Sequence, residues 1–414
     1  MTTDDVYAGI DDVAWAESEH CRGPAVDTPG YLRKLRSSVA EERDEAVDEL
    51  GASLYHLGAR YPATHLAVPF LLRIVHAPDT DGRGGLIEFL IMLAIGDDTD
   101  HFPSGFDVDA QRQCLADFRS CTAEGWERRL DVWVAAAVDQ GQRGRRERHR
   151  RYWALASVLR SAESAMLAYE AVRAGVPGMR QLLADEDPYV RAATAYLLAW
   201  FPEDSADSVT ALTALLRRES DSGVVINALI ALGLLPGAPT ATIAPYLSSD
   251  DDPIAWAAAA ALVAADAVDA TVIERLGAAL GSDSSNKTGL LYRYGEFSRC
   301  ASKCLAAITG DLVPLAIDTT IDAFSESSLT QMWAAAPAAI ALAFQGTAPA
   351  HEPAFAELNP YQKRALRALV AAGPRPWRQN NKLGLLLKPL RVPHIYNDLR
   401  AYVESGVSME AGRA

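Results

Sequence analysis

The chain has 414 residues, of which 49% are hydrophobic, so it can bury the cores of two or three domains or of one array that grows by stacking. Its 39 basic and 54 acidic side chains give a formal charge of −15, which argues against nucleic acid as a partner. Five scattered cysteines give no sign of a disulfide framework. The acidic N-terminus does not predict a signal peptide, and the apolar runs are too short to predict a membrane span. We therefore expect a cytoplasmic protein.

The first predicted helices follow an irregular lead-in. Thr28 is expected to cap a short helix with Pro29 as its first residue, because proline suits the position where no backbone N–H is needed. A longer helix is expected over 40–57, with apolar residues along one side and polar residues opposite. The apolar stripe comprises Val47, Leu50, Leu54 and Leu57, and the opposite face carries Glu45, Glu49 and His56.

The next segments are more apolar. Pro62 is expected to start a helix, and the nearly all-apolar stretch 85–96 predicts a buried helix. The residues of the first helix expected to point inward are Leu66, Phe70, Leu71 and Ile74. After a loop rich in helix breakers, the remaining elements of this section are two helices and a basic run. They span 108–121, 123–141 and 143–151.

A pattern in residues 185–204 returns twice along the chain. An aspartate stands three residues before an aliphatic residue each time, and the steps between the three aspartates are 34 and 30 residues. Small or apolar residues follow four, seven and eight positions later, which places them on one face of a helix. The spacing indicates one helix pair per repeat. The pairs are Asp187 and Val190, Asp221 and Val224, and Asp251 and Ile254.

These stretches resemble the HEAT-repeat family, whose second helix opens with Asp, Pro and Val-Arg before a stripe of Ala and Leu. The segment DPYVRAATAYLL has all of these features, whereas DSGVVINALIAL and DDPIAWAAAAAL have the stripe without the arginine. The resemblance implies an all-α, right-handed superhelix, a HEAT-like solenoid without a sheet. It also implies structural roles for Asp187, which would bond the backbone of a neighbouring turn, and Arg191, which would reach the next repeat.

The chain also resembles a narrower family of uncharacterised bacterial HEAT-repeat proteins. The resemblance lies in three N-terminal stretches, of which YPATHLAVPFLL is the most specific part, and in the C-terminal LNPYQKRALRALV. That family has no assigned activity, so it implies no catalytic residues. We expect three sections: atypical N-terminal helices over 1–160, a repeat block over 161–345, and a linker with a C-terminal helical cap over 346–414.

Two polar clusters are candidate binding sites because they interrupt aliphatic, repetitive stretches. The alternative for the first cluster is a solvated helix face in which Tyr61 makes an interhelical hydrogen bond, and for the second a loop that packs across the break in the repeats. The first cluster comprises Glu49, His56, Tyr61 and His65, and the second comprises Tyr292, Arg293, Tyr294 and Glu296.

The basic run offers Arg145, Arg146 and Arg148 as possible polyanion contacts, followed by aromatic residues that could stack on bases. The alternatives are a solvated helix that pairs with acidic residues of the chain, or a surface for an acidic protein. Trp256 is either a core residue or an exposed platform. The thiols are expected to be buried as small apolar groups, with no metal bound. They are Cys114, Cys121, Cys300 and Cys304.

No nucleophile elbow, zinc-protease helix, phosphate-binding loop or dinucleotide fingerprint is found. We therefore expect a non-catalytic scaffold that binds a protein or peptide along the concave surface and needs no cofactor. The alternative is an enzyme of the same fold, either a DNA glycosylase for alkylated bases or a catalyst acting on a small molecule in the groove. The two classes differ in charge, because a DNA enzyme needs its arginines inside the groove beside a carboxylate.

Overall fold

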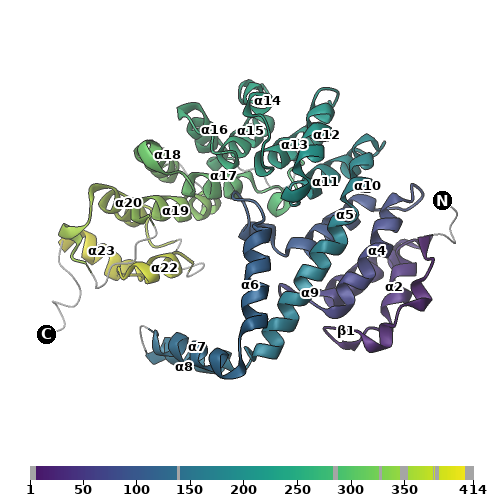
Figure 1. Cartoon of the computed structure of the whole chain (residues 1–414). Helices are drawn as coiled ribbons and strands as arrows, with labels where there is room; N and C mark the ends of the chain where they lie inside the picture. Colours follow the sequence, from purple (N-terminus) through teal and green to yellow (C-terminus); the bar gives the residue numbers. More distant parts are fainter. Residues whose placement is uncertain are drawn as a thin grey trace. The chain divides into compact units, whose positions relative to one another are not determined.

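The computed structural model describes residues 6–137, 140–282, 288–325, 329–345, 353–375, 377 and 382–405. The chain forms two compact units: unit 1 is Met1–His101 with Phe106–Ala211, and unit 2 is Phe102–Gly105 with Leu212–Ala414. Helices and turns make up the described part of both units, apart from two short hairpins (Figure 1). The expected all-α class is therefore confirmed, but the expectation that no strand pairs would occur is wrong at these hairpins.

Unit 1 begins with four helices, α2 to α5. Helix α4 begins at Pro62 as expected, and the hydroxyl of Thr64 accepts the N–H of Tyr61 at 3.0 Å, which closes the start of the helix. Helix α2 begins at Thr28 itself, one residue earlier than the predicted cap implies, with Asp27 at the N-cap position. The bounds are α2 (Thr28–Lys34), α3 (Ala40–Leu54), α4 (Pro62–His76) and α5 (Arg83–Ile95).

The helix predicted over 40–57 ends at Leu54, and a hairpin follows it. Strand β3 (Tyr55–His56) pairs with β4 (Ala59–Arg60) across a turn in which Leu57 and Gly58 have φ of 51° and 86°. Two positive φ values are what a two-residue hairpin turn of type I′ requires. Leu57 is therefore not part of the buried stripe but 93% exposed, and Val47 is exposed as well. The stripe of α3 is instead Ala46, Leu50 and Leu54.

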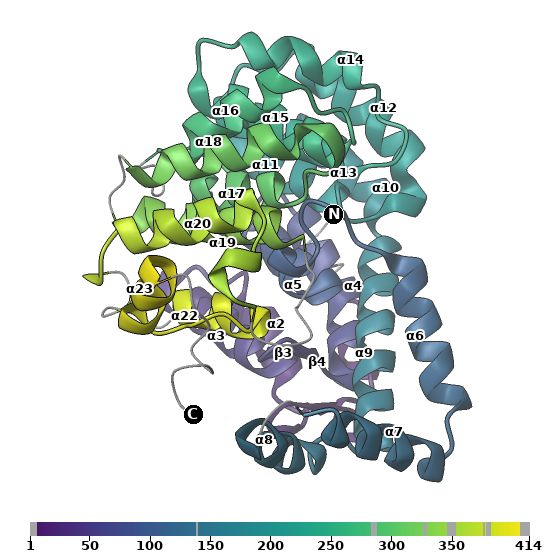
Figure 2. The same cartoon turned by 90° about the vertical axis from the view of Figure 1, so that its left-hand side faces the viewer.

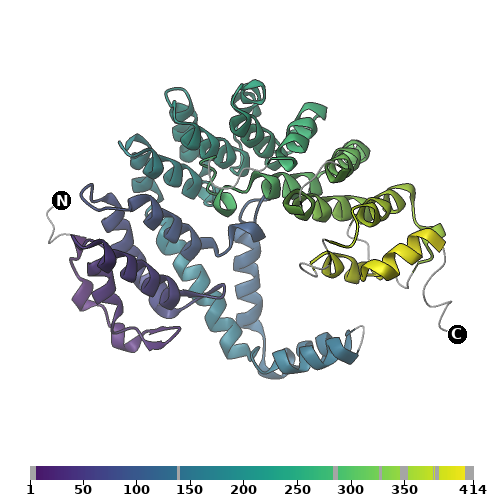
Figure 3. The same ribbon diagram turned by 180° about the vertical axis from the view of Figure 1, so that it is seen from behind.

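A similar hairpin, β1 (Glu19–His20) with β2 (Gly23–Pro24), precedes α2. Further along unit 1, α6 and α9 pack side by side, and α7 and α8 pack on each other where α6 ends and α9 begins (Figure 3). We call α7, α8 and residues 151–153 the arm. The bounds are α6 (Val108–Ser120), α7 (Ala123–Ala135), α8 (Gln140–Arg150) and α9 (Leu155–Arg173).

The predicted repeat register is confirmed at the helix starts. Asp187 is the N-cap residue of α11 (Pro188–Leu198) and its carboxylate accepts the N–H of Tyr189 at 2.8 Å. Asp221 does the same for α13 (Ser222–Leu234), accepting the N–H of Val224 at 3.0 Å. The following residues of both stripes are buried, including Val190 and Val224. Aspartate at each position therefore satisfies backbone donors that would otherwise lack a partner.

The third repeat, α15 (Asp252–Ala264), differs slightly. Asp251 is again the N-cap residue, but its carboxylate accepts the hydroxyl of Ser222 at 2.8 Å instead of a backbone N–H of its own helix. Ile254 is only half-buried. Trp256 is a core residue: its ring is buried and its centroid lies 5.5 Å from that of Phe297.

Helices α13 and α15 pack closely because small residues line both. A Cβ atom added to Gly233 would lie 2.4 Å from the carbonyl oxygen of Ala261, so a glycine is needed at this crossing. Among the later helices of unit 2, α16 packs against α17 and α18, and α19 packs against α17, α18 and α20 (Figure 2). Their bounds are α16 (Ala270–Leu280), α17 (Phe297–Ala306), α18 (Val313–Ser325), α19 (Leu329–Phe344), α20 (Pro360–Ala371), α22 (Lys382–Leu387) and α23 (Tyr396–Ser405).

None of the helices within the described ranges combines the length and apolar character that a bilayer crossing requires.

Candidate functional site

Unit 1 contains an open cavity of about 550 Å³ between α6, α7, α9 and the β3–β4 hairpin. Figure 2 shows the backbone of these elements, with the β3–β4 hairpin beside α9. Most of its wall is apolar, with rings contributed by Phe118 of α6, Trp126 of α7 and Trp153 of the arm. A volume of 300–1,000 Å³ with a largely apolar lining is typical of small-molecule sites.

The aromatic wall of the cavity is held by contacts among its own residues. The rings of Phe118 and Trp126 meet edge to face with centroids 5.6 Å apart. The indole N–H of Trp126 donates to the carbonyl oxygen of Trp153 at 2.6 Å, and the ring of Trp153 stacks on Trp133 at 5.0 Å. The arm is thereby tied to α6 through aromatic packing.

The charged residue of the cavity wall is Arg60, the last residue of β4. Its Nη1 donates to the carbonyl oxygen of Gly58 at 3.1 Å, and its guanidinium lies against Gly96. No carboxylate of the described residues forms an ion pair with it. Burial, partly offset by the nearby Tyr55 hydroxyl, lowers the pKa of Arg60 below its usual value.

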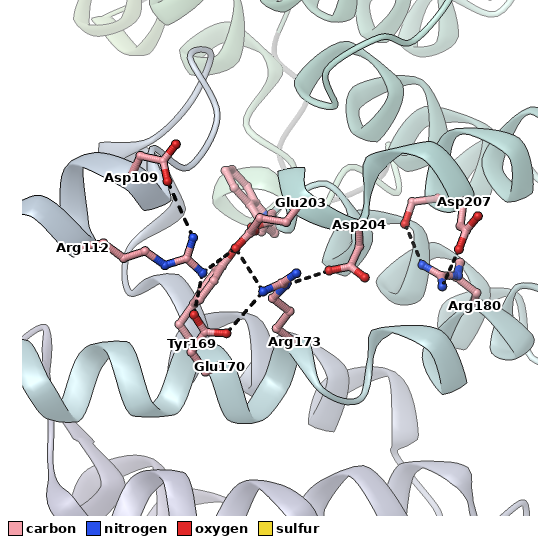
Figure 4. Close-up of polar contacts among 11 residues, drawn as sticks. Asp109, Arg112, Tyr169, Glu170, Arg173, Arg180, Glu203, Asp204 and Asp207 are labelled. Atoms are coloured by element: carbon pink, nitrogen blue, oxygen red, sulfur yellow. Dashed lines mark hydrogen bonds and ion pairs between the residues drawn. The ribbon is translucent and has the colours of Figure 1, made fainter.

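A network of ion pairs joins the other end of α6 to α9 (Figure 4). Arg112 of α6 donates to Glu170 of α9 at 2.6 Å and to Glu203 at 2.7 Å. Glu203 lies in a short 3₁₀ helix, η5 (Pro202–Asp204), that follows α11. Burial alone would raise the pKa of Glu203, but hydrogen bonds from Tyr169, from backbone and from Arg112 lower it. The network stabilises the ionised carboxylate.

Two further contacts complete this network. The hydroxyl of Tyr169 donates to Glu203 at 2.6 Å. The pKa of Tyr169 is raised far above its usual value, mainly by burial and also by the hydrogen bond to this carboxylate. Arg173 of α9 donates to Asp204 at 2.8 Å. Each charged residue of this network pairs with at least one of opposite sign, with two arginines shared among three carboxylates (Figure 4). These contacts position α6 and η5 against α9.

Helix α11 is tied to the N-terminal helices by two tyrosine–carboxylate pairs that were not predicted. The hydroxyl of Tyr189 donates to Glu88 of α5, whose pKa is raised by burial despite this bond. The hydroxyl of Tyr196 donates to Asp98 at 2.6 Å. Both pairs join residues about 100 positions apart, which the local sequence pattern cannot indicate.

The predicted N-terminal cluster is not joined by direct contacts. Glu49 of α3 forms an ion pair with Arg22, and His56 is exposed on β3. Tyr61 and His65 are half-buried at the start of α4, where burial raises the pKa of the tyrosine and lowers that of the histidine. No hydrogen bond or ion pair links any two of these four described residues. Their role in binding stays a prediction.

The expected aromatic rim at 292–296 is wrong for Tyr292. Its side chain is fully buried, and its ring centroid lies 4.6 Å from that of Phe102, so it is a core residue of unit 2. Arg293 and Glu296 remain partly exposed and form an ion pair at 3.8 Å. The side chain of Tyr294 lies outside the described residues.

The basic run forms α8, and its arginines differ in their contacts. Arg146 lies over the ring of Trp133 at 5.1 Å, and Arg150 pairs with Asp131 at 2.6 Å. Arg145 and Arg148 are exposed and form no ion pair with a described residue. Pairing with acidic residues of the chain therefore accounts for only part of the run.

The cysteines fall into two groups. Cys300 and Cys304 are buried as expected, and the Sγ of Cys304 lies 4.0 Å from the carbonyl oxygen of Ala260. The expectation is wrong for Cys114, which is exposed and lines the cavity, and for Cys121, which is partly exposed. Among the described residues, no three His, Cys, Asp or Glu side chains come together as a metal site would require.

Comparison with known proteins identifies HEAT repeats at residues 154–233 and 176–263. No curated protein matches the chain. Among solved structures, the chain resembles an engineered protein, with 18% identity over 92% of this chain and 98% of that one and a TM-score of 0.29. It also resembles the cohesin subunit Scc3 of Z. rouxii, with 12% identity over 90% of this chain and 45% of that one and a TM-score of 0.29. Neither resemblance is close enough to indicate a function.

Proposed function

We propose that this HEAT-repeat α-solenoid protein is a non-catalytic scaffold that binds a protein or peptide partner, and that the arm forms part of the binding surface. Solenoids of stacked helix pairs present extended surfaces that suit protein recognition. The observation that carries the proposal is that the arm exposes large apolar side chains beside arginines that form no ion pair with described residues.

The exposed apolar residues of the arm are of the kind that dominate protein interfaces. Val132, Tyr152 and Trp153 are 70%, 65% and 43% exposed. Tyrosine, tryptophan and arginine are the residue types most enriched among interface residues that contribute strongly to affinity. Because Trp153 is held by its stacking on Trp133, little side-chain freedom would be lost on binding.

Charge favours an acidic partner. Residues 140–163 contain seven arginines and two glutamates, whereas the whole chain has a formal charge of −15. The acidic remainder of the protein repels an acidic partner, whereas the basic arm attracts it, so the partner is steered toward the arm. The location of further binding residues on the concave side of the solenoid is also part of this proposal.

The test compares three forms of the protein, each tagged and recovered from its native host. One is wild type, one carries Arg145→Glu and Arg148→Glu, and the control carries Arg217→Glu and Arg375→Glu, which change the net charge equally at exposed arginines of unit 2. A partner identified with wild type is then purified and titrated against all three. We expect the arm variant to bind it at least about tenfold more weakly, which corresponds to 1.4 kcal/mol, and the control to bind as wild type does.

Equal loss of affinity in both variants would show a general charge effect and remove the arm from the binding surface. Recovery of no stoichiometric protein partner with wild type would contradict the scaffold function itself. The DNA glycosylase alternative has no specific observation in its favour, and weak duplex binding that does not depend on the arginines of α8 would count against it.

A further inference from the structure

We propose that the cavity between α6, α7, α9 and the β3–β4 hairpin binds a small amphipathic anion, with Arg60 holding the charged group and the aromatic wall holding the apolar body. The ligand class is a molecule with one carboxylate, sulfonate or phosphate on an aromatic or aliphatic skeleton. This site needs no protein partner, although Tyr152 and Trp153 belong both to its wall and to the proposed partner surface.

The first argument is the unsatisfied state of Arg60. The other strongly buried arginines of unit 1 face carboxylates: Arg36 pairs with Asp79 at 2.5 Å, and Arg83 pairs with Asp185 at 2.6 Å. Arg60 has no such partner among the described residues, and its buried Nε donates no hydrogen bond. A buried cation without an anion is costly, and an anionic ligand would remove that cost.

The second argument is the composition of the wall. Arg60 is the one formally charged side chain among the described residues that line the cavity. The other polar groups there are neutral, such as the amide of Gln111 and the hydroxyls of Ser157 and Ser161, and the rest are apolar. A single positive charge in an apolar site selects a ligand with one negative charge and an apolar body.

The third argument is that the wall is preformed. The Trp126–Trp153 hydrogen bond fixes the arm side of the cavity, and the ion pairs of Arg112 fix α6 against α9. A ligand can therefore enter without ordering new structure, which favours binding of a small molecule.

The probe is 1-anilinonaphthalene-8-sulfonate, and its neutral counterpart is N-phenyl-1-naphthylamine, which has the same ring systems without the sulfonate. Fluorescence titration of wild type should give one site per chain for the anionic probe. Arg60→Met replaces the charged side chain by an unbranched apolar one. The anionic probe should bind this variant about tenfold more weakly, because charge-assisted hydrogen bonds are lost. The neutral probe should bind both proteins within about twofold, since its apolar contacts are unchanged.

Decanoate, decyl phosphate and decanol then compete with the anionic probe. Decanoate or decyl phosphate should displace it from wild type, and which of the two is stronger identifies the head group. Decanol should displace it far more weakly. Arg22→Met, at an exposed arginine of the other hairpin, is the control and should bind as wild type does.

The location is checked with the thiol of Cys114. Ligand should slow the alkylation of Cys114, which lines the cavity, and leave the rate at Cys121, which does not, unchanged. Trypsin releases the two thiols on separate peptides, 113–119 and 120–128, so mass spectrometry reads both in one sample.

Ala165→Trp, which fills the cavity from α9, should abolish protection of Cys114 and weaken both probes; it keeps the test decisive if Arg60→Met does not fold. The proposal is overturned if Arg60→Met binds the anionic probe as wild type does, or if bound probe leaves Cys114 unprotected.

Discussion

The guanidinium of Arg83 donates to both carboxylate oxygens of Asp185, at 2.6 and 2.9 Å, although the two residues stand 102 positions apart. Both side chains are nearly buried, with 11% and 12% exposure. The pair joins the start of α5 to the loop before α11. Burial alone would raise the pKa of Asp185, but the bonds from Arg83 and from the N–H of Asp187 outweigh it and lower the pKa.

The first prediction concerns this pair. Asp185→Asn leaves the buried Arg83 without its anion and should lower the free energy of unfolding by about 3 kcal/mol at neutral pH. Because the folded-state pKa of Asp185 is lowered, its contribution is present above the unfolded value of about 3.9 and is lost as pH falls through the folded value. Urea unfolding from pH 7 to pH 3 should therefore show the two proteins converging in acid. A difference that stays constant with pH would contradict this.

The second prediction reverses the expectation for an exposed aromatic rim. Tyr292→Ala removes a buried ring packed on Phe102 and should lower the free energy of unfolding by about 3–5 kcal/mol. Tyr361→Ala, at an exposed tyrosine of the same unit, should cost less than about 0.5 kcal/mol. Thermal unfolding of the two variants provides the comparison, and equal melting temperatures would place Tyr292 outside the core.

The third prediction tests the repeat register. Val190→Asp buries a charge without a partner between helices of unit 1 and should destabilise the protein by several kcal/mol, since Val190 is fully buried. Val26→Asp makes the same chemical change at an exposed position and should be nearly neutral. Circular dichroism during heating measures the melting temperatures of both variants. A wild-type melting temperature for Val190→Asp would mean that the register is incorrect.

The fourth prediction uses two helical glycines. Gly233→Ala places a methyl group against the backbone of Ala261 and should cost about 1–3 kcal/mol by overpacking. Gly51→Ala, in α3, meets no atom within 4 Å and should instead stabilise the protein by about 0.5–1 kcal/mol through helix propensity. Opposite signs in chemical denaturation are the expected result. Stabilisation by both substitutions would show that α13 and α15 do not pack as closely as described.

The fifth prediction separates the scaffold from a DNA enzyme. At physiological salt the protein should bind a DNA duplex no more tightly than about 10⁻⁶ M, and replacing Arg145, Arg146 and Arg148 by Ala should change this little, because the chain as a whole is acidic. Fluorescence anisotropy over a range of salt concentrations gives the measurement. A tight affinity that falls steeply with salt and disappears in the variant would favour the glycosylase alternative.

The helices that were predicted well are those whose signals are local. Asp187 and Asp221 predict the starts of α11 and α13, because the capping residue and the apolar stripe that follows it belong to one helix. The burial of Tyr292 was missed because its partner, Phe102, is far away in sequence and nothing near Tyr292 indicates it.

The cavity was missed for a related reason. The helix predicted over 40–57 runs three residues past the observed end at Leu54, because the apolar spacing continues to Leu57. That extension hid the hairpin on which Arg60 stands. The pairing of α6 with α9, which builds the wall, depends on contacts such as Arg112 with Glu170 that only the folded chain reveals.

The tyrosine bonds of α11 have a consequence for the order of folding. Tyr189 and Tyr196 bond to Glu88 and Asp98, so the chain must close loops of about 100 residues before these contacts form. The repeats that begin with Asp221 and Asp251 meet within 30 residues. Contacts between near neighbours form faster than those that close long loops. During synthesis, therefore, unit 1 cannot be completed until α11 has been made, whereas the repeats that begin with Asp221 and Asp251 can pack on each other as soon as both are made.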